Sequence, residues 1–406
     1  MTRRFEHLDG LRGVASFIVI IYHGLLAFDL ALLTGAPGNS VTPWDIWLSG
    51  APFLIPMAGN FAVCLFFALS GFVLVGAFDS TPMGLIPLLA KRYVRLALPV
   101  TCACLFACLL LSAGLMANHE VSAITRSTWW LGRQYGQSAS FINAFQEGSW
   151  DTFTRTSDIS KTYDSSLWTM QIEFVGSAGI LLVCCLAKRL APESSARRVV
   201  YIASFAAFYG AFAESYVGLF AAGALIRQIF SNGWRPLTSR PCLALAICTF
   251  GIFCGTIPFS QAIWPMFRIF PNPGALNWMP WAATGPVFWH TVGAIVMLVG
   301  LQSSPLMQTV LKTPICRWLG SISYPLYLIH IPILMTLGCH VFLAGNEIGA
   351  PHKLSVILAL VTFVAVSLIC AHAFMLAVER PAIWFSGRVA RKIPSAMASI
   401  TQATVS

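Results

Sequence analysis

The sequence has few charged residues. Asp, Glu, Lys and Arg occupy 10% of its 406 positions, whereas hydrophobic residues occupy 57%. Soluble proteins carry about 25% charged residues, and one membrane span needs roughly 20 mostly apolar residues. Apolar segments of that kind recur from the N-terminus almost to the C-terminus, and no stretch is long and polar enough for a separate soluble domain. The composition therefore argues against a soluble protein and indicates a polytopic membrane protein.

Metal-binding patterns are also missing. The 12 cysteines include no CxxC pair, and no Cys/His set has the spacing of a zinc site. Most of them lie inside apolar runs, as Cys102, Cys104 and Cys108 do, where cysteine serves as a small apolar residue. We therefore expect no metal and no bound cofactor.

The net charge of +10 raises the question of a nucleic-acid partner. The basic residues, however, cluster in short turns between the apolar runs, which is the positive-inside pattern of membrane proteins. We therefore expect membrane lipid around the chain and no nucleic acid.

Ten apolar runs predict an all-α protein with about ten transmembrane helices. The first run, Val14 to Leu33, is too long for a cleaved signal peptide, so we expect it to be retained. We expect one transmembrane domain over residues 1–393 and a disordered tail over residues 394–406. The ten predicted spans are 11–33, 56–78, 96–117, 166–187, 199–213, 215–230, 241–259, 281–301, 319–343 and 355–377.

The Lys and Arg residues predict the orientation. With both termini in the cytoplasm, 19 of the 25 fall on the cytoplasmic side, and this asymmetry favours that topology. We expect the protein to lie in the cell (inner) membrane. Two long segments then lie outside, 118–165 and 260–280. The first combines tryptophans with carboxylates, which fits either an interfacial aromatic belt or a platform for a sugar acceptor. The second contains Trp264 and Trp278.

The first predicted helix contains two ionisable residues, which are costly inside a membrane and point to function. Arg12 and His23 are 11 residues apart, so they share a helix face and lie about 16 Å apart along the axis. An arginine at the cytoplasmic edge can hold phosphate, and a histidine in mid-membrane can act as a general base. The alternative is a snorkelling Arg and a His that bonds to a neighbouring helix.

Two further helices have buried polar groups. Glu173 lies in the fourth predicted span, a few residues from its outer boundary, and needs a partner, for which His23 or a basic residue is the natural candidate. In the ninth span His330 follows Tyr327 by three residues on nearly the same face. A structural pair between helices is the alternative interpretation for Glu173.

Arg92 and Arg95 share one face of a turn at the inner surface. Basic residues are expected there from topology alone, but a donor with several phosphates would also use such a pair.

Together these residues resemble the membrane-bound acyltransferase family 3, over nearly the whole chain. The segments that carry the resemblance are Leu8–Gly13 with Tyr22 and His23, Phe67–Phe72, Arg92–Arg95, Ser166–Trp168 with Glu173, Ser323–Tyr327 with His330, and Glu379–Pro381. The resemblance implies ten helices and acyl transfer from acyl-coenzyme A as co-substrate, often onto carbohydrate, as in polysaccharide O-acetylation. The paired acids usual in the fourth helix of the family are here Glu173 and Phe174, so one carboxylate is missing.

By this resemblance His23 is the catalytic residue, and Arg12, Arg92 and Arg95 bind the donor. We expect Glu173 to assist catalysis by orienting the base or holding the acceptor. Candidates for contact with the acceptor, or for support of the base, are Trp168, Tyr327 and His330. The acceptor would be a carbohydrate, a lipid-linked glycan or a small molecule with a hydroxyl group.

A transporter is the competing hypothesis, since buried Arg, His and Glu can also form a proton relay for export of a hydrophobic or glycolipid metabolite. No inverted repeat and no broken-helix pattern is visible in the sequence, which argues against it.

Overall fold

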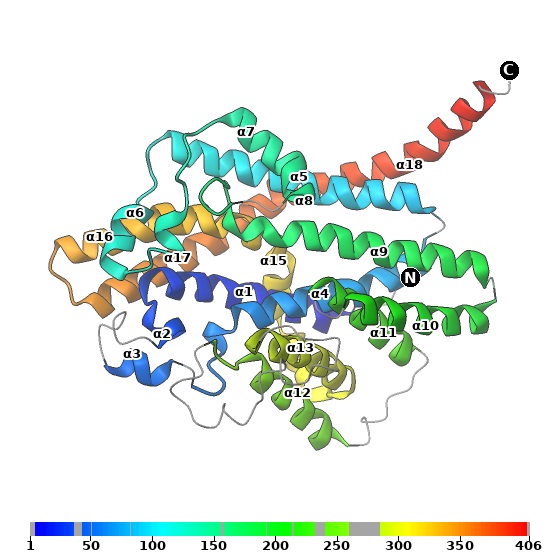
Figure 1. The fold of residues 1–406 in the computed structure, drawn as a ribbon, viewed down its shortest axis with the longest axis horizontal. Helices are drawn as coiled ribbons and strands as arrows, with labels where there is room; N and C mark the ends of the chain where they lie inside the picture. The colour runs from blue at the N-terminus through cyan, green and yellow to red at the C-terminus, as the bar shows by residue number, and fades with distance from the viewer. Residues whose placement is uncertain are drawn as a thin grey trace.

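A computed structural model describes residues 5–35, 43–49, 51–81, 83–155, 158–191, 193–212, 215–231, 240–259 and 285–403. Within these ranges the regular structure is helical, with no strand. Each of the ten predicted spans contains a helix (Figure 1). These helices are α1 (Glu6–Phe28), α4 (Gly59–Asp79), α5 (Leu85–Ser112), α9 (Trp168–Leu190), α10 (Ser194–Phe212), α11 (Val217–Ser231), α12 (Pro241–Gly255), α13 (Pro286–Ser303), α15 (Pro314–Ile333) and α17 (His352–Phe374).

Seven helical stretches in the described ranges are long and apolar enough to cross a membrane. They contain α1, α4, α5, α9, α13, α15 and α17, and two shorter apolar helices, α11 and α12, accompany them. The all-helical, multi-pass architecture is therefore confirmed. The exact number of ten spans and the cytoplasmic position of both termini stay predictions.

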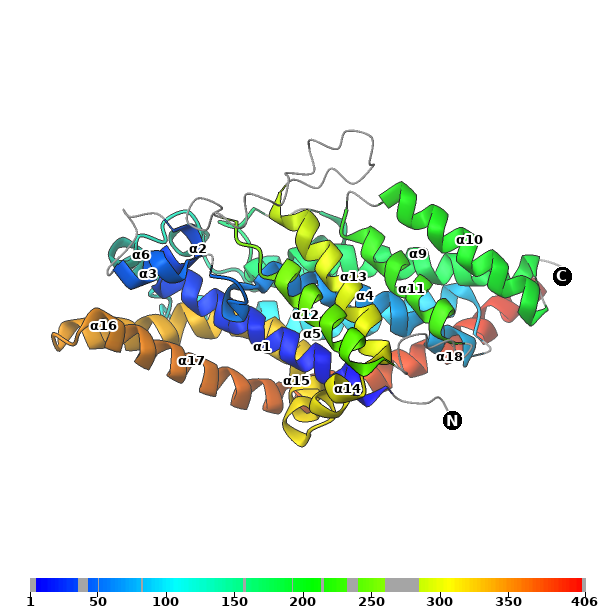
Figure 2. The ribbon, with the colours of Figure 1, turned by 90° about the horizontal axis from the view of Figure 1, so that it is seen from below.

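Five helices form a ring in which neighbours are in contact: α1, α4, α9, α5 and α15. In Figure 1, α1, α4, α5 and α9 run along the long axis of the molecule, and Figure 2 shows α12 and α13 packed together outside α4. The ring matters because its helices carry most of the candidate site residues, namely Arg12, His23, Arg92, Arg95, Glu173, Tyr327 and His330.

Glycines let the ring helices approach closely. A Cβ atom added to Gly13 of α1 would lie 2.3 Å from the backbone nitrogen of Gly320 in α15, which is far inside contact distance. Gly71 of α4 and Gly223 of α11 face each other's helix backbones just as tightly. Small residues of this kind are what allow membrane helices to pack backbone to backbone.

The outer segment 118–165 is folded and packed. It contains α6 (Asn118–Thr125), η3 (Leu131–Arg133), α7 (Phe141–Gln146), η4 (Glu147–Asp151) and α8 (Thr152–Thr154), and η5 (Ser165–Leu167) follows it. Its α7 and η4 pack along α5, and the Ser127 hydroxyl donates to the carbonyl oxygen of Leu26 at the end of α1 (2.9 Å). The predicted outer segment 260–280, with Trp264 and Trp278, lies outside the described residues.

The remaining helices extend these elements. The short ones are α2 (Ala31–Thr34), α3 (Pro43–Leu48), η2 (Ile55–Met57), α14 (Pro305–Leu311), η8 (Leu334–Gly338) and α16 (Cys339–Glu347). From α17 the chain continues through η9 (Met375–Glu379) into α18 (Arg380–Ala403), which passes beside α5 (Figure 1). The disordered tail proposed for 394–406 stays a prediction, since the side chains there are outside the described residues.

Candidate active site

An arginine-lined cavity of about 230 Å³ lies inside the five-helix ring. We call it the arginine cavity. Its polar lining comes from all five ring helices and from η9, and consists of Arg12, Ser70, Arg92, Arg95, Thr169, Glu173, Ser323, Tyr324, Tyr327 and Glu379. The structure thus brings together the three arginines and the glutamate that the sequence singled out on three different helices.

Arg92 and Glu173 form an ion pair in this cavity. Their side chains are only 14% and 12% exposed. The Ser70 hydroxyl also donates to Glu173 Oε1 (2.6 Å), and Arg92 Nε donates to the hydroxyl of Ser177 (3.0 Å). Of the two partners expected for Glu173, a basic residue is the one present, and His23 is not in contact with it.

The predicted depths of Glu173 and Arg92 are incompatible with each other, because an outer-boundary residue cannot pair with one at the inner surface. The reason is where α9 begins. Tyr327 donates its hydroxyl to the carbonyl oxygen of Ser166 (2.6 Å), just before α9. Tyr327 lies 13 residues, or about 20 Å, along α15, so α9 starts inside the bundle rather than at the outer surface.

Arg12 and Arg95 line the same cavity without an ion pair closer than 4 Å among the described residues. Glu379 lies within electrostatic range of both. The lining therefore has three guanidinium groups against two carboxylates, and this excess of positive charge suits an anionic ligand.

His23 and His330 form a hydrogen-bonded pair, with 2.8 Å between His23 Nδ1 and His330 Nε2. His330 is fully buried, and its Nδ1 faces the carbonyl oxygens of Tyr327 (2.9 Å) and Leu326 (3.1 Å). Because a carbonyl oxygen only accepts, Nδ1 of His330 carries the hydrogen, and its Nε2 accepts from His23 Nδ1. The lone pair of neutral His23 is then on Nε2, where a general base needs it.

Tyr327 connects the arginine cavity with the histidine pair. Tyr327 lines the cavity, and its ring lies 5.9 Å from that of His330. Phe66 also lines the cavity and packs against Tyr327, with ring centroids 6.3 Å apart. His23 itself remains partly exposed. Arg12 thus lines the cavity, and His23 lies about 16 Å further along the same face of α1, outside the cavity lining.

Other residues fall outside this arrangement or were missed. Trp168 is 45% exposed, packs at a tilt against Tyr216 and does not line the cavity, so its placement gives no support to a role beside the acceptor. Glu379 joins the arginines although only its motif, and no role, had been noted in the sequence. A carboxylate at the end of an apolar helix was the signal. Trp130, whose ring stacks on His23, had no signal at all, because only the fold brings them together.

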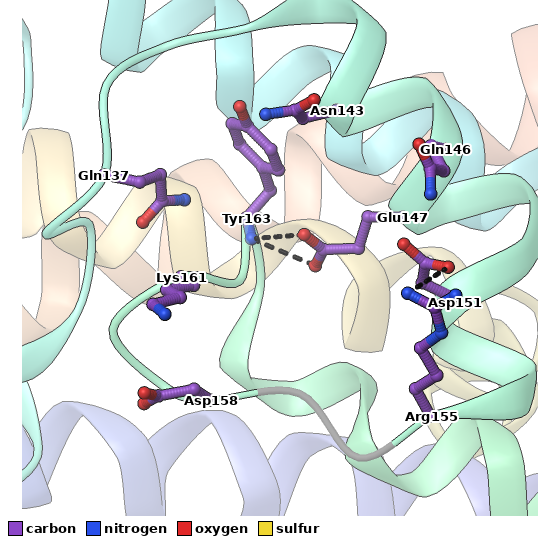
Figure 3. Close-up of a pocket in the computed structure, with 9 residues that line it drawn as sticks. All are labelled: Gln137, Asn143, Gln146, Glu147, Asp151, Arg155, Asp158, Lys161 and Tyr163. Atoms are coloured by element: carbon purple, nitrogen blue, oxygen red, sulfur yellow. Dashed lines mark hydrogen bonds and ion pairs between the residues drawn. The ribbon is translucent and has the colours of Figure 1, made fainter.

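A second cavity, of about 370 Å³, lies within the outer segment and shares no lining residue with the arginine cavity (Figure 3). At its centre the Tyr163 N–H donates to Glu147 Oε1 (3.0 Å). Burial raises the pKa of Glu147 to about 7, and burial likewise raises the pKa of nearby Asp164 to about 8. Across the described parts of the chain, no three His, Cys, Asp or Glu side chains gather as a metal site would require.

Comparison with known proteins identifies the family. Residues 5–375 match the acyltransferase domain of the family Acyl_transf_3. O-acetyltransferase PaAT-1 of Phomopsis amygdali is 23% identical over 377 residues, covering 82% of this chain and 72% of that protein. Acyltransferase clz18 of Cochliobolus lunatus is 25% identical over 406 residues (83% and 84%), and acyltransferase R4 of a Phoma species is 22% identical over 410 residues (83% and 84%).

No solved structure matches the chain. The family match spans nearly the whole sequence and all of the helices that build the arginine cavity and the histidine pair, apart from η9, which it enters only at Met375. The chain therefore belongs to the membrane-bound acyltransferase family 3 and is an acyl-transferring enzyme.

Proposed function

We propose that the enzyme transfers an acyl group from cytoplasmic acyl-coenzyme A to a hydroxyl group of an acceptor, with His23 as general base. The observation that carries the proposal is the alignment along α1. The arginine cavity begins at Arg12, and His23, with the lone pair on Nε2, lies about 16 Å further along the same helix face. In acyl-coenzyme A the pantetheine arm separates the charged phosphates from the thioester, so the phosphate-binding group and the general base must also lie apart.

The donor's phosphates would bind at the arginine cavity. Arg12 and Arg95 have no ion pair closer than 4 Å among the described residues, and the planar guanidinium can hold phosphate through two hydrogen bonds at once. Arg92 is held in place by Glu173, so we assign that glutamate to positioning rather than to the reacting atoms. The pantetheine arm would extend past Tyr327 toward His23.

In the transfer step the acyl group moves from the thioester sulfur to the acceptor oxygen. Nε2 of His23 takes the proton of the acceptor hydroxyl while the oxygen attacks the thioester carbonyl. The C–S bond breaks as the new C–O ester bond forms, and the imidazolium returns its proton to the leaving thiolate, which departs as coenzyme A. His330 accepts from Nδ1 of His23 throughout and keeps the lone pair on the reacting nitrogen.

The acceptor and the acyl group are proposed only by class. A relative is named an O-acetyltransferase, which supports a hydroxyl acceptor and an acetyl group here. Within that class, a carbohydrate, a lipid-linked glycan or a small molecule fits the chemistry. Untargeted comparison of glycans, lipids and small metabolites from cells with and without the enzyme would identify which one gains an ester.

The direct test uses purified full-length enzyme in detergent with acetyl-coenzyme A and an extract of the producing cells as acceptor source. We expect release of coenzyme A thiol, which a transporter would not give because detergent abolishes any gradient. His330→Gln retains an oxygen that can accept from His23, so it should keep more activity than His330→Leu. Equal activity of the two variants would contradict the role given to His330.

A further inference from the structure

We infer that Trp130 is a positioning residue for the reaction, and that its indole face stabilises His23 when this histidine holds the acceptor's proton. The inference rests on the proposed role of His23. The two rings are parallel within 2°, with centroids 5.3 Å apart. His330 bonds to the edge of the His23 ring, so Trp130 and His330 together restrain both its face and its edge.

The outer segment is built to hold Trp130 firmly. Asn118 Nδ2 donates to the carbonyl oxygens of Leu131 and Gln134, both at 2.9 Å, which closes the chain around the tryptophan. The Ser127 hydroxyl fastens the same stretch to the end of α1. Trp130 is only 7% exposed, whereas its neighbour Trp129 is 51% exposed.

The backbone around Trp130 also has an uncommon conformation. Arg126 and Tyr135, on either side of this stretch, both have positive φ, 61° and 56°. Non-glycine residues adopt this region at a cost, and such conformations persist only where the surroundings enforce them. The segment therefore accepts unfavourable backbone geometry in the stretch that carries Trp130 to His23.

The stack favours the reaction because its strength depends on charge. An aromatic face attracts a cation more strongly than a neutral ring. Neutral His23 becomes an imidazolium as it accepts the proton, so the indole stabilises the transition state more than the resting enzyme. An interaction of that kind raises kcat and leaves donor binding unchanged.

The test compares Trp130→Phe, Trp130→Leu and the matched control Trp129→Leu in full-length enzyme. The chain has eight histidines, so the ring signals of histidine-labelled protein can be resolved by NMR, and His23→Ala assigns the signal of His23 by its disappearance. We expect Trp130→Leu to shift this signal as the ring current of the indole is lost, and Trp129→Leu to leave it in place. An unchanged signal in Trp130→Leu would refute the stack.

Kinetics decide the second half of the inference. Trp130→Leu should lower kcat about 3- to 30-fold, the equivalent of one cation–π contact, while the KM for acetyl-coenzyme A stays constant. Trp130→Phe should fall in between, since phenylalanine keeps a weaker aromatic face. Wild-type kcat in both variants would overturn the positioning role. An inactive wild-type enzyme would instead refute the proposed function, and the NMR result would still show whether the stack exists.

Discussion

The arginine cavity and the histidine pair satisfy their polar groups in opposite ways. In the cavity, side chains balance one another: Arg92 pairs with Glu173, and Glu379 lies near the two remaining arginines. At the histidine pair the partners are a second imidazole and backbone carbonyl oxygens, which at 2.9 and 3.1 Å fix the hydrogen on Nδ1 of His330. Under the proposed function, a charged binding region and a neutral reaction centre thus share the same bundle.

Their separation has a physical reason. A cation close to His23 would oppose protonation of the base. At an effective dielectric constant of 20, two positive charges 4 Å apart repel by about 4 kcal/mol, and at 16 Å by about 1 kcal/mol. In the proposed mechanism, the helix length between Arg12 and His23 would therefore allow strong phosphate binding without a large penalty on the proton transfer.

Replacement of His23 should break the reaction centre and leave the cavity intact. We expect His23→Ala to lower single-turnover acyl transfer roughly 10²- to 10⁴-fold, the loss of a general base. Donor affinity should change little, because the proposed phosphate site lies at the other end of the helix. His340→Ala, at an exposed histidine, is the control. Near-normal transfer in His23→Ala would show that His23 is not the general base.

Replacement of Arg12 should weaken the arginine cavity and leave the histidine pair intact. Arg12→Ala removes charged hydrogen bonds worth about 1.5–3 kcal/mol, so the Kd for acetyl-coenzyme A should rise about 10- to 100-fold. Arg12→Lys should recover only part of this, because an ammonium cannot reproduce the planar fork. Arg317→Ala is a matched control, since this arginine is 48% exposed and pairs with Glu6 outside the cavity. Normal donor binding by Arg12→Ala would place the phosphates elsewhere.

Replacement of Glu173 tests whether this glutamate positions Arg92 or reacts with the acyl group itself. Glu173→Gln leaves an oxygen for Ser70 but releases Arg92 from its ion pair. We expect turnover to fall several-fold, whereas donor binding should not weaken, since the cavity becomes more positive. Glu120→Gln on the exposed side of α6 serves as control. An acyl group trapped covalently on Glu173 would show that the carboxylate reacts directly.

The smallest effect concerns the stability of the outer segment. Glu147 and Asp164 have raised pKa values, about 7 and about 8, because they are buried. The folded state therefore binds more protons than the unfolded chain, and stability is greatest below the unfolded pKa values and falls as pH rises through 7 to 8. Thermal unfolding in detergent should show a lower Tm at pH 9 than at pH 6. The double variant Glu147→Gln, Asp164→Asn should show less dependence, and an unchanged slope would contradict this account.

The sequence predicted the helices and one helix face well, for physical reasons. Apolar runs report membrane helices directly, and the 3.6-residue period places Arg12 and His23 on one face without tertiary information. Contacts between helices cannot be predicted in the same way, since they depend on where each helix begins. Glu173 reaches Arg92, which the sequence did not predict, because hydrogen bonds to Tyr327 place the start of α9 inside the bundle.

Two partners of His23 show the same limit. His330 was recognised as an intramembrane polar residue, but its pairing with His23 depends on the register of α15 against α1. Trp130 appeared only as one of several aromatic residues in an outer segment, where an interfacial position was an equally good interpretation. Its stacking follows from how Asn118 and Ser127 fold that segment back.

The close contact of Gly13 with Gly320 has a consequence for spacing along the chain. His23 and His330 each follow their glycine by ten residues, on helices that run in parallel. The glycine contact thus fixes the register of α1 against α15, and the same number of residues on each helix leads from it to the hydrogen bond between the histidines. One inserted residue between Gly13 and His23 would advance the histidine by about 1.5 Å and turn it by about 100°, so the hydrogen bond between the two histidines depends on the ten-residue interval.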